Sequence, residues 1–354
     1  LIDQGLSSRC PVLIGPVDSI CGKGLVGHYA PLMRGRSLET FLGENPVSLV
    51  QHLQLAVALA YAVDVLHGMM ISHGDLHASN ILVDKCDSVL RLGLIDFDNF
   101  AAPGLPPPPS LGQKWYLAPE LRENHARGRK VYPDIMSELF SLGVLMHEII
   151  LCRHVAAGAD GDESSFTKAM CSGRWLHDPD DTLLSAEELE GYPSAILNAD
   201  LAQLFRRALS RDRSRRPQAR EWLRCLAKVI HEVLLCPTCS CPSVVHTYRT
   251  ACPSCRTPYP VLVLVCASGR QVALEHASVV VGRNQLGGSS KVSERHAIFR
   301  RSGPESRVQA FGRNGTFRWN GKGWARFPLR EERLIAEGDR LLFADTEMRV
   351  ERQT

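Results

Sequence analysis

Two short polar segments constrain the fold of this chain more than any other feature. The first covers residues 73–80 with the sequence HGDLHASN, and the second covers residues 95–98 with the sequence IDFD. Together they supply a carboxylate at Asp75, an amide at Asn80 and a second carboxylate at Asp96. The apolar runs between the two segments flank a polar turn, which is typical of two short strands. The pattern therefore predicts a small sheet that carries both polar segments to one cleft.

The three polar side chains match the needs of phosphoryl transfer. That reaction uses a carboxylate to receive the proton of the attacking hydroxyl, a side-chain oxygen to hold one magnesium ion, and a second carboxylate to hold magnesium against the phosphates. Asp75, Asn80 and Asp96 fit these roles in that order. The two segments resemble the catalytic loop and the metal-binding loop of protein kinases. This resemblance implies ATP and Mg²⁺ as cofactors, with Asn80 and Asp96 as the magnesium ligands.

The same resemblance implies roles for five further residues. The sequence LAPE, which ends at Glu120, resembles the end of a kinase activation segment. In the family, a Glu at this place pairs with a later Arg, which is Arg216 here. His73 is expected to be a structural residue of the catalytic loop. Met33, at the start of a segment that resembles the kinase hinge, and His77 are expected to contact the nucleotide.

Several positions depart from the protein-kinase pattern. Gly74 stands where an Arg that reads a phosphorylated activation loop is usual, so control by such phosphorylation is not expected. His77 replaces a Lys, and the form HGDLHxxN is also seen in small-molecule kinases. Asp98 replaces the Gly of D-F-G and removes backbone freedom, while Glu138 stands where the central helix of the family has an Asp. A proline run at 106–109 predicts a stiff spacer or docking motif. These departures are typical of divergent, bacterial-type kinases.

The part of the chain before the first polar segment is short for a protein kinase. Apolar runs at 12–17 and 25–32 predict two strands joined by a turn around residues 21–24. Helix-period apolar residues at 47–70 predict a long buried helix. In the family, a glycine-rich loop, a phosphate-pairing Lys and its partner Glu precede those strands. We therefore expect the chain to be N-terminally incomplete and, as given, to bind ATP poorly.

Cysteines predict a second, much smaller module. Cys236 and Cys239 form one C-x-x-C pair, Cys252 and Cys255 form another, and 12 residues separate the pairs. Two such turns place four thiolates tetrahedrally around a zinc ion, which stabilises a module too small to fold on its core alone. Disulfides and a thioredoxin-like redox site are the alternative interpretations. Cys241 is an alternative ligand or a bystander.

After the cysteines, the pattern of apolar residues changes from a helical period to the alternation of short strands. Turn residues separate these strands at the regular spacing of a β-sandwich. The predicted strands cover residues 261–265, 272–274, 279–281, 297–299, 308–311, 316–319 and 341–343.

Polar residues in the turns of this predicted sandwich resemble the signature of a forkhead-associated (FHA) domain, a family that binds phosphothreonine peptides. By that resemblance Arg283 and Ser293 bind the phosphate and Asn314 fixes the peptide backbone. Arg295 lies one position later than the Arg that commonly follows the Ser, so its phosphate contact is less secure. His296 is expected to brace the loop. The alternative is a sandwich that uses these residues only to form turns.

These predictions combine into a multi-domain fold class. Residues 1–234 are expected to form an α+β protein-kinase-like domain with a partial N-lobe, residues 235–259 a zinc ribbon, and residues 260–354 an all-β FHA sandwich. A net charge of +3 over 354 residues gives no support for a nucleic-acid partner. No membrane span or secretory leader is expected, and the composition favours the cytoplasm.

The function predicted from the sequence is an ATP-dependent Ser/Thr protein kinase in bacterial signalling, with a C-terminal reader of phosphothreonine. Its partners would be a protein substrate and a phosphothreonine protein bound in trans. Two alternatives remain, a catalytically inactive scaffold that binds phosphothreonine partners and a small-molecule phosphotransferase.

Overall fold

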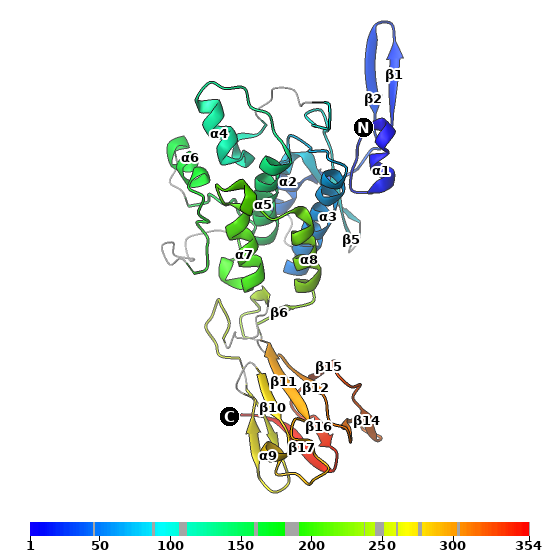
Figure 1. The fold of residues 1–354 in the computed structure, drawn as a ribbon, viewed down its shortest axis with the longest axis vertical. Helices are drawn as coiled ribbons and strands as arrows, with labels where there is room; N and C mark the ends of the chain where they lie inside the picture. Colours follow the sequence, from blue (N-terminus) through cyan, green and yellow to red (C-terminus); the bar gives the residue numbers. More distant parts are fainter. Residues whose placement is uncertain are drawn as a thin grey trace. The chain divides into compact units, whose positions relative to one another are not determined.

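The computed structural model divides into two compact units, residues 1–233 and 234–354 (Figure 1). It describes residues 1–44, 47–86, 89–105, 112–158, 162–180, 191–236, 238–244, 251–259, 261–274, 278–302 and 305–353. The proline run predicted to be stiff, at 106–109, lies outside the described residues.

The first unit is mainly helical. Its α-helices are α1 (Leu6–Arg9), α2 (Leu38–Glu44), α3 (Leu49–Gly68), α4 (Pro119–Ala126), α5 (Ile135–Leu151), α6 (Glu163–Cys171), α7 (Ala199–Ala208) and α8 (Ala219–Val229). Short 3₁₀ turns are η1 (Ile2–Gln4), η2 (Ala78–Asn80), η3 (Lys114–Tyr116), η5 (Ser194–Ile196) and η6 (Arg213–Arg215). The strands are β1 (Asp18–Gly22), β2 (Leu25–Tyr29), β3 (Arg36–Ser37), β4 (Ile81–Cys86) and β5 (Val89–Leu94). A further strand, β6 (Val233–Leu235), starts at the last residue of this unit.

Strands β1 and β2 form an antiparallel hairpin in which Gly22 pairs with Leu25. The predicted turn is therefore present, and its two intervening residues, Lys23 and Gly24, have positive φ angles of 48° and 79°. The predicted first strand at 12–17 is wrong, because the pairing starts only at Asp18. Apolar character in that run reflects burial, since Leu13 is fully buried and makes a single bridge to Leu94.

Strands β3, β4 and β5 form the small sheet that the two polar segments predicted. Strand β4 starts directly after the first segment, and β5 ends directly before the second. The side chain of Met33 packs directly against the sheet at Gly93, because Gly93 lacks a side chain. A Cβ atom at Gly93 would lie 2.0 Å from Sδ of Met33. The sheet thus places the predicted hinge next to the strand that leads to Asp96.

Helices α3 and α5 form the core of the first unit and pack against each other. Helix α3 starts at Ser48, whose hydroxyl accepts from the backbone N–H of Gln51 in a capping box. It is the one helix among the described residues with the length and composition of a membrane-spanning segment, yet ten of its side chains are buried in the unit. This burial is typical of the core helix of a globular domain.

A buried ion pair closes the helical part around the segment that ends in LAPE. Both terminal nitrogens of Arg216 donate to the carboxylate of Glu120, at 2.8 and 2.7 Å. The side chain of Arg216 is fully buried and also donates to the carbonyl of Met136 on α5. Glu120 lies in the first turn of α4, so the pair fixes that helix to the core.

The second unit contains a cysteine-rich segment followed by strands. The elements are β7 (Pro242–Val244), β8 (Leu262–Val265), β9 (Gln271–Ala273), β10 (Ser278–Val281), α9 (Arg283–Leu286), β11 (Ala297–Ser302), β12 (Glu305–Ala310), β13 (Thr316–Trp319), β14 (Trp324–Arg326), β15 (Glu332–Ile335), β16 (Arg340–Phe343) and β17 (Thr346–Arg352).

Two antiparallel sheets enclose the core of this unit. One has the order β10-β11-β12-β15 and the other the order β14-β13-β16-β17-β8-β9, while β6 pairs with β7 before them. Alternate side chains of both sheets, including Phe299, Val308 and Phe343, meet in one buried cluster. The predicted sandwich-like region and all seven predicted strands are therefore present, with bounds that shift by up to three residues. Strands β14, β15 and β17 were not predicted.

Candidate functional site

His73 holds the catalytic loop, residues 73–80, against the end of β5. Its Nε2 lies 2.9 Å from the carbonyl of Ile95, and its Nδ1 accepts from the backbone N–H of Asp75 at 3.3 Å. The ring also packs on Phe97, with centroids 4.8 Å apart. Complete burial lowers the pKa of His73, so the ring is neutral at pH 7. His73 thereby joins the two polar segments that the sequence placed at one cleft.

Glu138, in the first turn of α5, anchors the same loop to the helical core. Its Oε2 accepts from the backbone N–H of Gly74 at 2.9 Å, and its Oε1 lies 2.9 Å from Nε2 of His67 on α3. The Glu138 side chain is 2% exposed. A carboxylate at such depth requires partners for both oxygens, and these partners come from the catalytic loop and from the core helix.

Asp75 presents a carboxylate with partners on both oxygens. Its Oδ1 accepts from the backbone N–H of Gln113 at 3.3 Å and lies 3.6 Å from Nε2 of His77. Its Oδ2 accepts from Nδ2 of Asn99 at 3.3 Å. Burial by itself would raise the pKa of Asp75, but His77 and the Gln113 N–H favour the charged form and hold the pKa below its usual value. Asp75 is therefore ionised at neutral pH.

Asn80 and Asp96 lie on the two sides of the junction between the loop and the sheet. The side-chain amide of Asn80 donates to the carbonyl of Asp75 at 3.0 Å, and the backbone carbonyl of Asn80 accepts from the N–H of Ile95 at 3.0 Å. Asp96 has a φ angle of +63°, a left-handed conformation that is uncommon for residues other than Gly and that occurs at functional sites. This backbone turns the chain away from β5 and leaves the Asp96 side chain exposed.

A cavity of about 780 Å³ extends from Asp96 to the predicted hinge. Of the residues predicted to bind the cofactor, Met33 and Asp96 line this cavity, whereas His77 and Asn80 contact Asp75. Apolar walls and a carboxylate at one end suit a ligand with an aromatic base and charged phosphates. The other lining residues include Ile14, Pro16, His28, Leu82, Ile95, Phe97 and Asp98.

A second cavity, of about 830 Å³, includes Ala78 of the catalytic loop in its lining. Gln113, which bonds to Asp75 through its backbone, Trp115 and Glu148 also line it. Glu148 on α5 accepts from the hydroxyl of Tyr116 at 2.8 Å. Burial raises the pKa of Glu148 to about 7 and also raises the pKa of Tyr116. The cavity is therefore lined both by Gln113, which bonds to Asp75, and by a carboxyl group whose pKa is near neutral.

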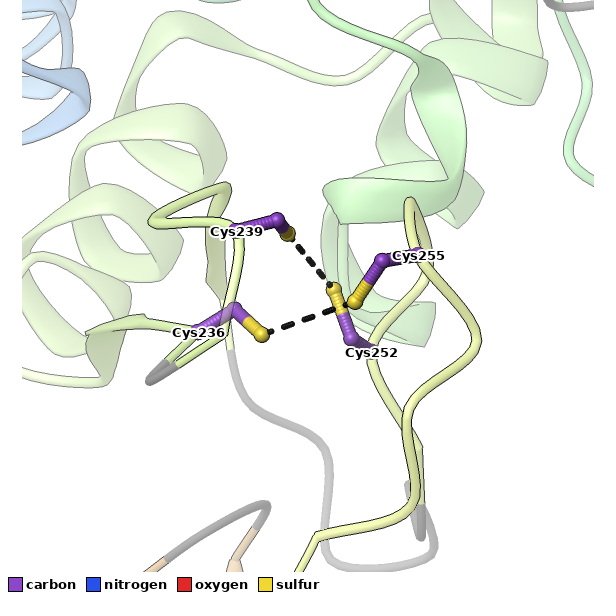
Figure 2. Close-up of side chains that lie close together, drawn as sticks. All are labelled: Cys236, Cys239, Cys252 and Cys255. Atoms are coloured by element: carbon purple, nitrogen blue, oxygen red, sulfur yellow. Dashed lines mark hydrogen bonds between the residues drawn. The ribbon is translucent and has the colours of Figure 1, made fainter.

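Four sulfur atoms meet in the second unit, as Figure 2 shows. The Sγ atoms of Cys236 and Cys255 are 3.8 Å apart, those of Cys239 and Cys252 are 3.6 Å apart, and all four lie within 4.8 Å of one another. Sulfurs bound tetrahedrally to zinc at about 2.3 Å would be roughly 3.8 Å apart, whereas a disulfide needs about 2.05 Å. Cys241 packs against this cluster. The arrangement is consistent with zinc.

The residues predicted to bind a phosphopeptide gather around one loop of the sandwich. Arg283 donates through Nε to the carbonyl of Val292 at 3.0 Å, and its backbone N–H donates to the carbonyl of Ser293 at 3.0 Å. Asn314, from the turn between β12 and β13, donates to the carbonyl of Lys291 at 2.7 Å. Gly282 allows the close approach, because a Cβ there would lie 1.7 Å from the Glu294 carbonyl oxygen.

The two remaining residues of this predicted site have different surroundings. His296 is fully buried, lies 3.0 Å from the carbonyl of Gly315 through Nε2, and accepts from the N–H of Ser293 at 3.2 Å. The guanidinium of Arg295 lies over the ring of Phe311, 5.6 Å from its centroid. His296 thus braces the loop, and Arg295 packs on an aromatic ring beside it.

Three residues of the site were not predicted from the sequence. His67, Asn99 and Gln113 reach the loop only through tertiary packing. Gln113 could have been found from its place just before the LAPE sequence. The other two carry no local pattern that separates them from ordinary helix or loop residues.

Comparisons with known proteins agree with the geometry of the first unit. Residues 26–226, more than half of the chain, match the family described as Protein kinase domain. A probable inactive receptor kinase of Arabidopsis thaliana is 27% identical over 134 residues, which are 34% of this chain and 12% of that protein. Activin receptor type-1C of Rattus norvegicus is 29% identical over 125 residues, which are 32% of this chain and 25% of that receptor. The chain thus covers at most a quarter of the length of these relatives.

The raised pKa of Glu148 predicts a pH-dependent stability. An acid that titrates near 7 when folded and at 4.5 when unfolded binds more protons in the folded state, so its contribution to stability is lost as the pH rises from 4.5 through 7. Glu148→Gln should remove this slope, at most about 1.4 kcal/mol per pH unit. Denaturant unfolding between pH 5 and 8 (roughly the window set by linkage) measures it. Glu163→Gln, at a side chain 75% exposed, is the control and should keep the wild-type slope.

Proposed function

This chain belongs to the protein kinase family, and on that premise we propose that it transfers the γ-phosphoryl group of ATP to a Ser or Thr hydroxyl of a protein. The observation that carries the proposal is the Asp75 carboxylate, ionised and held on both oxygens by groups from neighbouring segments. One cavity contains the predicted nucleotide side, with Met33 and Asp96, and the other opens beside Gln113.

In the proposed reaction Asp75 accepts the proton of the attacking hydroxyl. A carboxylate accepts hydrogen bonds at about four lone-pair positions, and a depressed pKa keeps it charged at neutral pH. Such a group orients the hydroxyl and takes its proton as the bond to phosphorus forms. The new ester keeps the substrate oxygen, and ADP leaves with the bridging oxygen of ATP.

Asn80 and Asp96 are the residues that would hold magnesium. Their amide and carboxylate oxygens are the ligand types this ion prefers, and they flank the junction of loop and sheet. When bound, the ion neutralises charge on the phosphates. The chain's own contribution is orientation, since His73 and Glu138 fix the backbone on which Asp75 is carried.

The shape of the second cavity supports a protein substrate. A groove of about 830 Å³ beside Gln113 is larger than a single hydroxyl-bearing side chain needs, and it carries an aromatic wall at Trp115, which is 42% exposed. Aromatic and polar walls of this kind suit an extended peptide. A small-molecule acceptor would need a more enclosed site.

Loss of the Asp75 carboxylate should abolish phosphoryl transfer. Asp75→Asn keeps the shape but removes the proton acceptor, so transfer of radiolabelled phosphate from ATP to a generic protein substrate should fall roughly 10²- to 10⁴-fold. Asp200→Asn, at an exposed site on α7, is the matched control and should retain full activity.

Three outcomes of this experiment are distinct. Equal transfer by wild type and Asp75→Asn would contradict the assigned role. Binding of MgATP without any transfer by the wild type would favour the inactive scaffold. Transfer to an aminoglycoside or another small alcohol in preference to protein would favour the small-molecule phosphotransferase.

We also propose that the four cysteines bind a structural zinc ion. All four coordination positions would be filled by protein sulfur, which leaves none for a substrate. The fit rests on the sulfur spacing and on the knuckle backbone, where the N–H of Thr238 points to Sγ of Cys236 at 3.4 Å.

Zinc removal should loosen the cysteine-rich segment. Cys252→Ser removes one buried ligand, so the purified chain should lose its stoichiometric zinc, measured by atomic absorption, and the segment at 236–259 should exchange its amide hydrogens faster. Cys241→Ser is the control and should keep the metal. If Cys252→Ser keeps zinc and Cys241→Ser loses it, Cys241 is the zinc ligand and Cys252 is not.

For the sandwich we propose phosphothreonine-peptide binding at the loop that carries Arg283. A guanidinium has five donors, and the side-chain bonds of Arg283 to the carbonyls of Val292 and Ser290 use two of them. Anchored in this way, Arg283 is preorganised to grip a phosphate. Ser293 and Asn314 lie on the same loop or contact it. The phosphopeptide would come from a partner or from the substrate of the kinase unit.

Arg283→Ala should remove phosphopeptide binding without unfolding the sandwich. Calorimetric titration with a phosphothreonine peptide library should show at least a tenfold weaker affinity, which corresponds to loss of a charge-assisted bond. Arg333→Ala, at a side chain 51% exposed on β15, is the control. Unchanged affinity in Arg283→Ala would place the phosphate elsewhere.

A further inference from the structure

Gly74 and Asn99 meet where the catalytic loop crosses the segment that follows Asp96. Gly74 has a φ angle of +83°, and a Cβ at this position would lie 1.9 Å from the carbonyl oxygen of Asn99. No side chain fits there. The Gly that replaces the usual Arg of the family therefore lets the two segments touch through their backbones.

The contact brings the side chain of Asn99 to Asp75. Nδ2 of Asn99 lies 3.3 Å from Oδ2 of Asp75. The orientation of the amide follows from chemistry, because an ionised carboxylate can only accept hydrogen bonds and the amide oxygen cannot donate one. Asn99 therefore donates to Oδ2, while His77 and Gln113 face the other oxygen, Oδ1.

We propose that Asn99 is a positioning residue that fixes the Asp75 carboxylate for catalysis and that makes this fixation independent of a phosphate on the activation segment. The inference rests on the proposed kinase function. An Arg at position 74 could not fix the loop through a bound phosphate here, because only Gly fits at that position. Asn99 instead fixes the orientation of the Asp75 carboxylate from within the chain.

Counting acceptor positions gives the inference a stereochemical consequence. Oδ1 of Asp75 faces Gln113 and His77, and Oδ2 faces Asn99. Each carboxylate oxygen offers about two lone-pair positions, and among the described residues Oδ2 accepts one hydrogen bond, from Asn99. In the proposal the attacking hydroxyl binds the second position of Oδ2, because His77 faces Oδ1, and the amide of Asn99 prevents rotation of the carboxylate that would exchange the two oxygens.

Two substitutions separate this role from a backbone role. Asn99→Ala removes the donor, and Asn99→Asp keeps the shape but replaces the donor with a second carboxylate that repels Asp75. We expect kcat for protein phosphorylation to fall about tenfold in Asn99→Ala and about a hundredfold in Asn99→Asp, the range for loss of a bond to a charged group. KM for ATP should stay within about twofold, because the amide acts on the proton-accepting group.

Asn124→Asp is the matched control, since Asn124 lies on α4 with its side chain engaged by Arg129, and it should behave as wild type. Asn99→Asp with wild-type kcat would overturn the inference and leave only the backbone contact with Gly74. A raised KM for ATP with unchanged kcat would also overturn it and assign Asn99 to nucleotide binding. A wild-type chain that binds MgATP but transfers no phosphate would refute the proposed function itself, and the inference with it.

Discussion

The site depends on the two hydrogen bonds that the buried carboxylate of Glu138 makes. Glu138 lies in the first turn of α5, and its carboxylate contacts the N–H of Gly74 with one oxygen and His67 with the other. Removing one partner would leave a buried, unpaired charge, a defect that costs several kcal/mol. The catalytic loop is therefore attached to the two core helices of the unit, and the position of Asp75 follows from the packing of α3 against α5.

The placement of Asp75, Asn80 and Asp96 around one junction could be predicted because it is local. Asp75 and Asn80 lie on one short loop, and Asp96 follows strand β5. Two apolar runs in the sequence predict the strands between them. His67 and Glu138 are separated by 71 residues, and Asn99 lies 24 residues from Asp75. Such pairs depend on how helices and loops pack against one another. The periodicity of apolar residues in the sequence does not report which distant residues meet.

The errors in the fold prediction have the same origin. Apolarity at 12–17 predicts a strand, but apolarity reports burial, and Leu13 is buried without extended pairing. Strand β15 was overlooked for the opposite reason. Its sequence ERLI exposes three of four residues, and charged side chains are what a strand at the edge of a sheet uses to resist further pairing. Alternation of hydrophobicity is weakest where a strand has one neighbour.

The three groups that face the Asp75 carboxylate come from two parts of the chain. His77 belongs to the catalytic loop, whereas Asn99 and Gln113 lie between Asp96 and Glu120, on the segment that resembles the kinase activation segment. Both carboxylate oxygens therefore contact that segment, Oδ1 through Gln113 and Oδ2 through Asn99. In a kinase with an Arg at position 74 that segment would be coupled to the loop through a phosphate, and here the coupling is replaced by a backbone crossing that only Gly permits.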